Sequence, residues 1–156
     1  MNTHEQRLCE LQADIFESSA EVFKCSSPYF VARFMKSAIV NKLDNTSDSY
    51  NYMSITSMLF MLRLEYPSLC KKEGLHYPPQ VLRWIGYIYR AYSILKKRRS
   101  HKIYKQLKVE KLLTLYEAFH TFSVEYCVDQ LEILINEKNE TPKSDYEIFK
   151  LVMDAK

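Results

Sequence analysis

The chain has 156 residues, of which 47% are hydrophobic and 26% are charged, and its formal net charge is +3. This length and apolar content suffice for one domain with a substantial core and are too small for two ordinary domains. Only two glycines and five prolines are present, which argues against disorder, a disulfide scaffold and a turn-dense β-sandwich. We therefore expect an all-α fold, a compact single-domain bundle of about seven helices.

Capping signals and apolar periodicity predict where these helices lie. Thr3 to Gln6 has the form of a capping box, Ser27-Pro28 is a typical helix start, and Tyr66-Pro67 is a typical helix end. Within the fifth segment a short helix from His101 to Leu107 is followed by a second one from Val109 to Phe119. The expected helices cover residues 4–24, 28–43, 54–65, 79–97, 101–119, 123–136 and 144–154.

The helix predicted at 79–97 divides into two stripes when it is laid out at helical spacing. The apolar stripe, which we expect to pack on the core, consists of Val81, Ile85, Ile88, Tyr92 and Leu95. The second stripe is cationic and partly apolar, and consists of Arg83, Tyr87, Arg90, Ile94 and Lys97. An arginine–tyrosine–arginine row has the composition of an interface hot spot, so we expect Tyr87 to be exposed and to bind a partner. The alternative is that another helix of the chain covers this stripe.

An acidic stripe runs along the first predicted helix. Its members are Glu10, Asp14, Glu17 and Glu21. One interpretation is a solvated helix face, which is common on surface helices. Another is that it pairs with the cationic stripe of residues 83–97, either within one chain or across a homodimer.

Basic side chains are concentrated in one part of the sequence. The net charge is −1 over residues 1–82, +9 over 83–111 and −5 over 112–156. The basic segment contains Lys96, Lys97, Arg98, Arg99, Lys102, Lys105, Lys108 and Lys111. Three interpretations remain open, namely stabilisation of a helix C-terminus, contact with nucleic-acid phosphates, and docking to an acidic protein.

Residue types that carry chemistry are sparse. The four cysteines form no C-x-x-C pair and have no histidine at metal-ligand spacing, and the chain has no glycine-rich phosphate loop and no hydrolase or metalloprotease motif. We therefore expect no enzyme, no cofactor and no metal site. His120 lies at a predicted helix break and is the best single candidate for a special role, although the sequence favours a histidine that caps a helix.

The N-terminal residues are charged and amphipathic, unlike a signal peptide, and the longest apolar stretches are too short to cross a bilayer. We expect a cytoplasmic protein without a membrane partner.

The segment PPQVLRWIGYIYRAY, with SPYFVARFMKSAIVNKLD before it and HKIYKQLKVEKLLTLYEAFHTF after it, resembles a family of small bacterial proteins. Members carry an F-M-N-S segment, a W-I-G-Y-I-Y-R-Y-W helix, an I-Y-K-I segment and a Y-H-T-L-D-P turn. They are encoded on mobile elements beside toxin-like genes. The resemblance covers about Ser27 to Leu131. The matching residues are Trp84, Gly86, Tyr87, Arg90, Tyr104, His120 and Thr121.

The chain departs from the family pattern at three places. These are Lys36-Ser37 in place of Asn-Ser, Ala91-Tyr92 in place of Tyr-Trp, and Phe122-Ser123-Val124 in place of Leu-Asp-Pro. The resemblance implies an antitoxin-type neutraliser that occludes a partner protein, a toxin encoded nearby.

Two functions follow as expectations. In the first, a protein partner contacts Arg83, Tyr87, Arg90, Lys97, Arg98, Arg99 and His120. In the second, a regulator binds nucleic acid through residues 96–111, with contacts from Lys96, Lys97, Arg98, Arg99, Lys102, Lys105 and Lys108.

Overall fold

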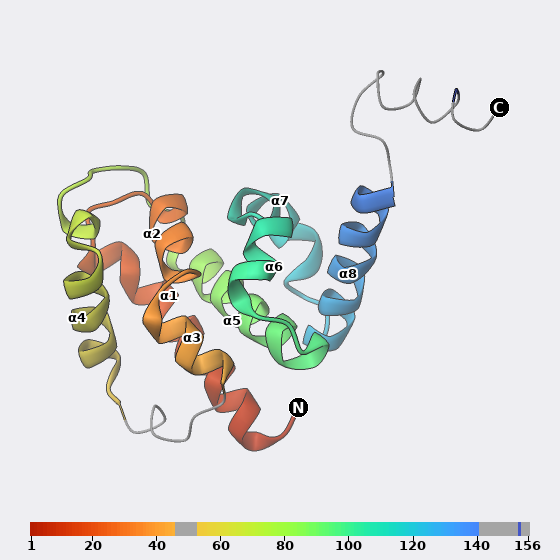
Figure 1. The fold of residues 1–156 in the computed structure, drawn as a ribbon, viewed down its shortest axis with the longest axis horizontal. Coiled ribbons are helices and arrows are strands. Elements are labelled where there is room, and N and C mark those ends of the chain that lie inside the picture. The colour runs from red at the N-terminus through yellow and green to blue at the C-terminus, as the bar shows by residue number, and fades with distance from the viewer. Residues whose placement is uncertain (46–52, 141–152, 154–156) are drawn as a thin grey trace.

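The computed structural model describes residues 1–45, 53–140 and 153. Within these ranges the chain forms eight α-helices and a short 3-10 helix, η2, and no strand, which confirms the predicted all-α single domain (Figure 1). The elements are α1 Thr3–Val22, α2 Ser27–Phe34, α3 Ala38–Asp44, α4 Ile55–Glu65, η2 Pro67–Cys70, α5 Pro79–Lys96, α6 Ser100–Gln106, α7 Val109–Phe119 and α8 Val124–Glu140.

Polar side chains mark the starts of the first four helices. Asn2 caps α1, because its side chain accepts a 2.8 Å hydrogen bond from the backbone N–H of Glu5, whose carboxylate accepts one from the backbone N–H of Asn2. The capping box is thus one residue earlier than predicted from Thr3. Ser26, Ser37 and Ser54 cap α2, α3 and α4 in the same manner.

The predicted helix at 28–43 is wrong in one respect, because the chain breaks it into α2 and α3. Ser37 causes the break. Its hydroxyl donates to the carbonyl oxygen of Phe34 at 2.7 Å, which ends α2, and accepts from the N–H of Val40 at 3.1 Å, which begins α3. Side chains of this kind compete with the helical backbone for hydrogen bonds.

The segment predicted at 101–119 forms two helices, α6 and α7, separated at Leu107 and Lys108. The hydroxyl of buried Tyr89 donates to the carbonyl oxygen of Leu107 at 2.7 Å and so holds this break against α5. The last predicted helix, at 144–154, lies outside the described residues except for Met153.

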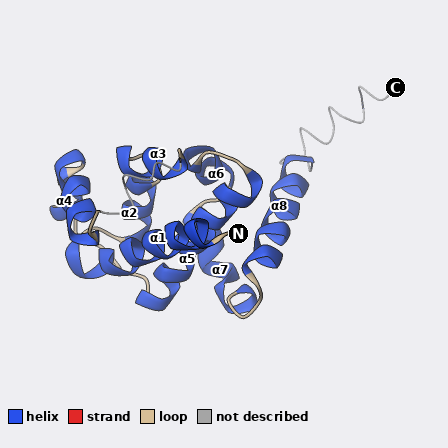
Figure 2. Cartoon of the chain, turned by 90° about the horizontal axis from the view of Figure 1, so that it is seen from below, coloured by secondary structure: helices blue, strands red, loops and turns tan. Residues whose placement is uncertain are grey.

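Helix α5 is the central element of the fold. Helix α1 packs along it in the most extensive helix pair, and α2 to α4 lie on one side of this pair while α6 to α8 lie on the other (Figures 1 and 2). Val81, Ile85, Ile88 and Tyr92 are buried as predicted, whereas Leu95 is only half-buried. Because neighbours surround α5, Leu82, Tyr89 and Arg90 on its other sides are buried as well.

A glycine permits the close approach of α1 and α5. A Cβ atom at Gly86 would lie 2.8 Å from the backbone oxygen of Gln12 and 2.8 Å from Cγ of Phe16. The side chain of Gln12 uses this proximity, since its amide donates to the carbonyl oxygen of Gly86 at 3.0 Å. Only glycine leaves enough space at this crossing.

Replacing this glycine tests the packing. Gly86→Ala gains helix propensity of up to about 1 kcal/mol, but the added methyl group meets backbone that cannot rotate away, and overpacking typically costs about 1–3 kcal/mol. We expect a net loss of about 1 kcal/mol in the free energy of urea unfolding. The reciprocal change Ala118→Gly on the exposed surface of α7 is the control, and should show the propensity cost alone. A Gly86→Ala protein more stable than the parent would contradict the close packing.

Candidate functional site

The cationic stripe predicted to meet a partner is largely occupied within the chain. Arg83 forms ion pairs with Asp14 and Glu17 on α1, the second at 3.0 Å. These bonds raise the pKa of the Arg83 guanidinium above its usual value. The acidic stripe therefore pairs with the cationic stripe inside one molecule at this point, in agreement with one of the two interpretations of the sequence. Arg83 remains 43% exposed at its side chain, so the pair is a surface ion pair of modest strength.

The prediction that Arg90 lies on an exposed stripe is wrong, because the residue is completely buried. Its guanidinium donates to Gln12 Oε1 at 2.9 Å, to Asp44 Oδ1 at 2.7 Å and to Ser100 Oγ at 3.1 Å. Burial lowers the pKa of Arg90 and the Asp44 carboxylate opposes that shift. An arginine keeps its charge under these conditions. Arg90 therefore stabilises the fold and has no surface to offer a partner.

Asp44, the last residue of α3, completes this buried centre. Its carboxylate accepts from Arg90, from the hydroxyl of Ser100 at 2.6 Å and from the backbone N–H of Ser100 at 2.9 Å. The last bond caps the N-terminus of α6, where a negative charge is also favoured by the helix dipole. One carboxylate thus joins α3, α5 and α6.

Tyr87 is half-buried against the core, which contradicts the expectation of an exposed contact residue. Burial raises the pKa of its hydroxyl, and the nearby Cys9, Glu10 and Glu125 add to the shift. Trp84 is also half-buried and packs edge-on against Tyr116 of α7, with ring centroids 5.6 Å apart. The motif from Trp84 to Arg90 is therefore accounted for by packing.

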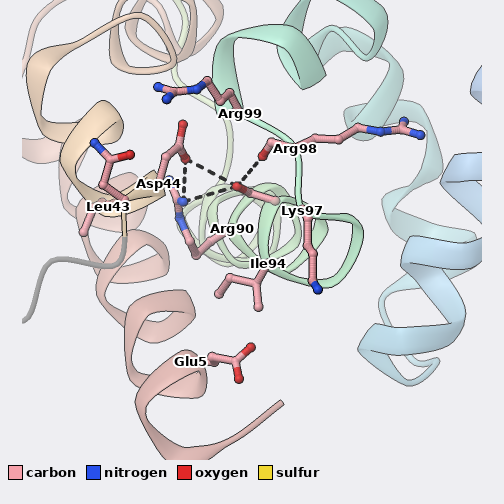
Figure 3. A pocket seen from close by; sticks show the side chains of 10 residues that line it. Glu5, Leu43, Asp44, Arg90, Ile94, Lys97, Arg98 and Arg99 are labelled. Atoms are coloured by element: carbon pink, nitrogen blue, oxygen red, sulfur yellow. Dashed lines mark hydrogen bonds and ion pairs between the residues drawn. The ribbon is translucent and has the colours of Figure 1, made fainter.

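A hollow of about 350 Å³ opens above Arg90 and Asp44, between the C-terminal ends of α3 and α5. Lys97, Arg98 and Arg99 lie at its rim, but Figure 3 shows that their side chains point in different directions and away from Arg90. Lys97 ends α5 in the left-handed region, at φ 52° and ψ 51°, which most often suits glycine. This residue turns the chain, so that Arg99 and α6 follow at an angle to α5.

Part of the predicted basic segment is neutralised by α8. Lys96 pairs with Asp129 at 2.7 Å, and Arg98 donates to both carboxylate oxygens of Glu132. The hydroxyl of Tyr92 also donates to Glu132, and burial and this carboxylate both raise its pKa. Lys96 and Arg98 thus attach α8 to the end of α5.

Arg99, Lys102 and Lys105 of the basic segment lie on or beside α6, and Lys36, from the turn before α3, lines the same hollow as Arg99 and Lys105. Lys36, Arg99, Lys102 and Lys105 are exposed, and none forms an ion pair with another residue of the described ranges. We call these four residues the α6 basic surface. Lys108, beyond the end of α6, lies over the ring of Tyr104 with its Nζ 4.3 Å from the centroid.

Two hollows flank α6, one toward α3 and one toward α8. The first, of about 480 Å³, is lined by Lys36, Asn41, Arg99, His101 and Lys105. The second, of about 520 Å³, has a lining that includes Arg98, Lys102, Lys105, Gln106, Asn136 and Asn139. Lys105 borders both hollows, and no carboxylate lines either of them within the described part of the chain. The basic surface is therefore a continuous band across α6.

His120 is exposed and forms the C-cap of α7. Its ring stacks on that of Tyr116 at a centroid distance of 4.3 Å, and its Nδ1 lies 2.7 Å from the carbonyl oxygen of the same residue. This geometry is that of a capping histidine, the second of the two interpretations of this residue. His120 follows the last residue of α7 and lines neither of the two hollows beside α6.

Within residues 1–45 and 53–140, no cluster of histidine, cysteine and acidic side chains has the geometry of a metal site. The described helices also include none that is long and apolar enough to cross a membrane.

Two matched variants on α5 compare the contribution of buried Arg90 to stability with that of half-exposed Arg83. Arg90→Met leaves the Asp44 carboxylate buried without its cation, so we expect a loss of about 3–5 kcal/mol in the free energy of unfolding. Arg83→Met, the same substitution on a half-exposed pair, should cost less than about 1 kcal/mol. Denaturant titration of both variants checks this. Equal losses would contradict the buried network.

Comparisons with known proteins add no assignment: no protein-family model, no curated protein and no solved structure matches the chain. The resemblance to small proteins encoded beside toxin-like genes remains a prediction from the sequence.

Proposed function

We propose that this protein binds nucleic acid through the α6 basic surface. The proposal rests on which basic side chains have a carboxylate partner within the chain and which do not. Arg83, Arg90, Lys96 and Arg98 have carboxylate partners within the chain, whereas the α6 basic surface has none among the described residues. Unpaired cations arranged in a band match the repeating negative charge of a phosphate backbone.

The surroundings of the band support this choice. A carboxylate close to the lysines would repel phosphate, and none lines the two hollows beside α6 in the described chain. Asparagine, glutamine and histidine side chains occupy the remaining polar positions there, and these groups hydrogen-bond to phosphates, sugars and bases. Asp44, paired with buried Arg90, accepts a hydrogen bond from the first turn of α6 and so fixes the position of the α6 basic surface.

Salt titration of nucleic-acid binding tests the proposal. We expect the logarithm of the association constant to fall linearly with the logarithm of salt concentration. The triple variant Arg99→Gln/Lys102→Gln/Lys105→Gln should reduce the slope by about one unit for each phosphate that its side chains no longer neutralise. Fluorescence anisotropy with a labelled oligonucleotide measures both quantities.

A matched control variant removes the same number of positive charges from another part of the protein surface. Lys24→Gln/Arg63→Gln/Lys71→Gln removes two exposed lysines and one exposed arginine around the far ends of α1, α4 and η2, and should leave the salt slope unchanged. No binding by the parent protein at low salt, or an equal reduction of the slope in the control, would exclude the α6 basic surface as a nucleic-acid site.

A second function, an antitoxin-type neutraliser that occludes a protein partner, is favoured by a different observation. Phe122, Tyr126 and Ile133 at the start and outer side of α8 are 51%, 47% and 47% exposed. Phe122 and Tyr126 pack edge-on with ring centroids 5.0 Å apart, and Ile133 lies two turns further along the same side of the helix. We call these three residues the α8 apolar patch. Aromatic side chains of this kind are enriched where proteins meet.

Co-purification with the product of the adjacent gene tests the second function. Phe122→Ser/Ile133→Ser should abolish such a complex while changing the stability of the chain by no more than about 0.5 kcal/mol, since both side chains are exposed. Phe60→Ser on α4, where the ring is 57% exposed, is the control and should retain the complex. A complex that survives the double substitution would show that the α8 apolar patch is not the contact surface.

A further inference from the structure

The outer face of helix α6 is narrow and polar, and its inner face is packed against the rest of the chain. Ser100, Ile103, Tyr104 and Leu107 are buried beneath it, and Asp44 caps its N-terminus. At about 100° per residue, the outward side chains follow one another across the helix in the order His101, Lys105, Lys102, Gln106. These four span about 140° of the helix surface. The polar face is therefore a ridge one helix wide.

The two hollows lie on opposite edges of this ridge. Figures 1 and 2 place α3 on one side of α6 and α8 on the other, and His101 borders the hollow next to α3 while Gln106 borders the one next to α8. Lys36 and Arg99 lie at the first edge, and Lys102 lies toward the second, where Arg98 is already paired with Glu132. The arrangement is a helical ridge with a basic hollow along each side.

We infer that the ligand is double-stranded DNA, with α6 in the major groove and one phosphate backbone over each hollow. This inference rests on the proposed nucleic-acid function. An α-helix with its side chains is about 10–12 Å across and the major groove of B-form DNA is about 12 Å wide, so the ridge fits between the two strands. The cations at the ridge edges then meet the phosphates on both sides.

The other nucleic acids fit this surface less well. Single strands are held by aromatic platforms on which bases stack, and no phenylalanine, tyrosine or tryptophan lines either hollow in the described chain. The major groove of A-form RNA is too narrow and deep for a helix. An acidic protein surface would satisfy the cations but does not require a hollow on each side of a ridge.

The ridge also carries groups that read base edges. Lysine donates to the O6 and N7 atoms of guanine, and glutamine bonds to the N6 and N7 atoms of adenine, all of which lie in the major groove. Lys105 lies at the middle of the ridge and Gln106 at its edge, both exposed. We therefore expect base contacts from these two side chains, while Lys36 and Arg99 on one side and Lys102 on the other position the protein on the backbone.

Competition among nucleic acids of one sequence tests this inference with the full chain. The probes are a DNA duplex of about 20 base pairs, one of its strands, and the corresponding RNA duplex, at about 50 mM salt. We expect the DNA duplex to bind at least about tenfold more tightly than the other two. Equal or tighter binding of the single strand or of RNA overturns the duplex assignment and leaves the proposed function standing. If none of the three binds, the proposed function itself fails, and the inference with it.

Chemical protection identifies the groove. Bound protein should shield guanine N7 in the major groove from dimethyl sulfate and leave adenine N3 in the minor groove reactive. Gln106→Ala should change the base preference in a selection from random duplexes, while Lys24→Gln, at an exposed residue just beyond the C-terminal end of α1, should not. Protection confined to adenine N3, or a selection unaffected by Gln106→Ala, would contradict a ridge in the major groove.

Discussion

The Asp44 carboxylate, held between the Arg90 guanidinium and Ser100, is the interaction on which the arrangement of this molecule depends. Arg90 is fully buried, and a buried charge is tolerated only when its hydrogen bonds are satisfied. Gln12, Asp44 and Ser100 supply these bonds from α1, α3 and the start of α6. Four helices therefore have to meet at one point, and the relative positions of α3 and α6 follow from that requirement.

The contact between Asp44 and Ser100 belongs to this buried centre and also positions the α6 basic surface. The bond from the backbone of Ser100 to Asp44 fixes the first turn of α6, while buried Ile103 and Leu107 fix its inner side. The lysines of α6 must then project outward between α3 and α8. A surface rigid at its base loses little conformational entropy when it binds.

The sequence motif that is easiest to notice is explained by packing. Gly86 allows α1 and α5 to approach, Trp84 packs against Tyr116, and Arg90 occupies the buried centre. The surfaces proposed to bind partners use residues outside this motif, namely the α6 basic surface and the α8 apolar patch. A distinctive segment in a helical protein can therefore indicate a shared way of folding without indicating a site.

The sequence by itself determined the helical class, most helix positions and the apolar stripe of α5, because periodicity and capping act over a few residues. It also located the basic segment. It left open whether the cationic stripe pairs with the first helix, as Arg83 does, and it did not reveal that Arg90 is buried or that Lys96 and Arg98 pair with α8. These outcomes depend on contacts between residues such as 44 and 90, which are distant in sequence and meet only when α5 is enclosed by its neighbours. Tertiary structure alone decided which cations pair with a carboxylate of the chain, because Arg90 reaches Asp44, and Arg98 reaches Glu132, only when packing brings their helices together.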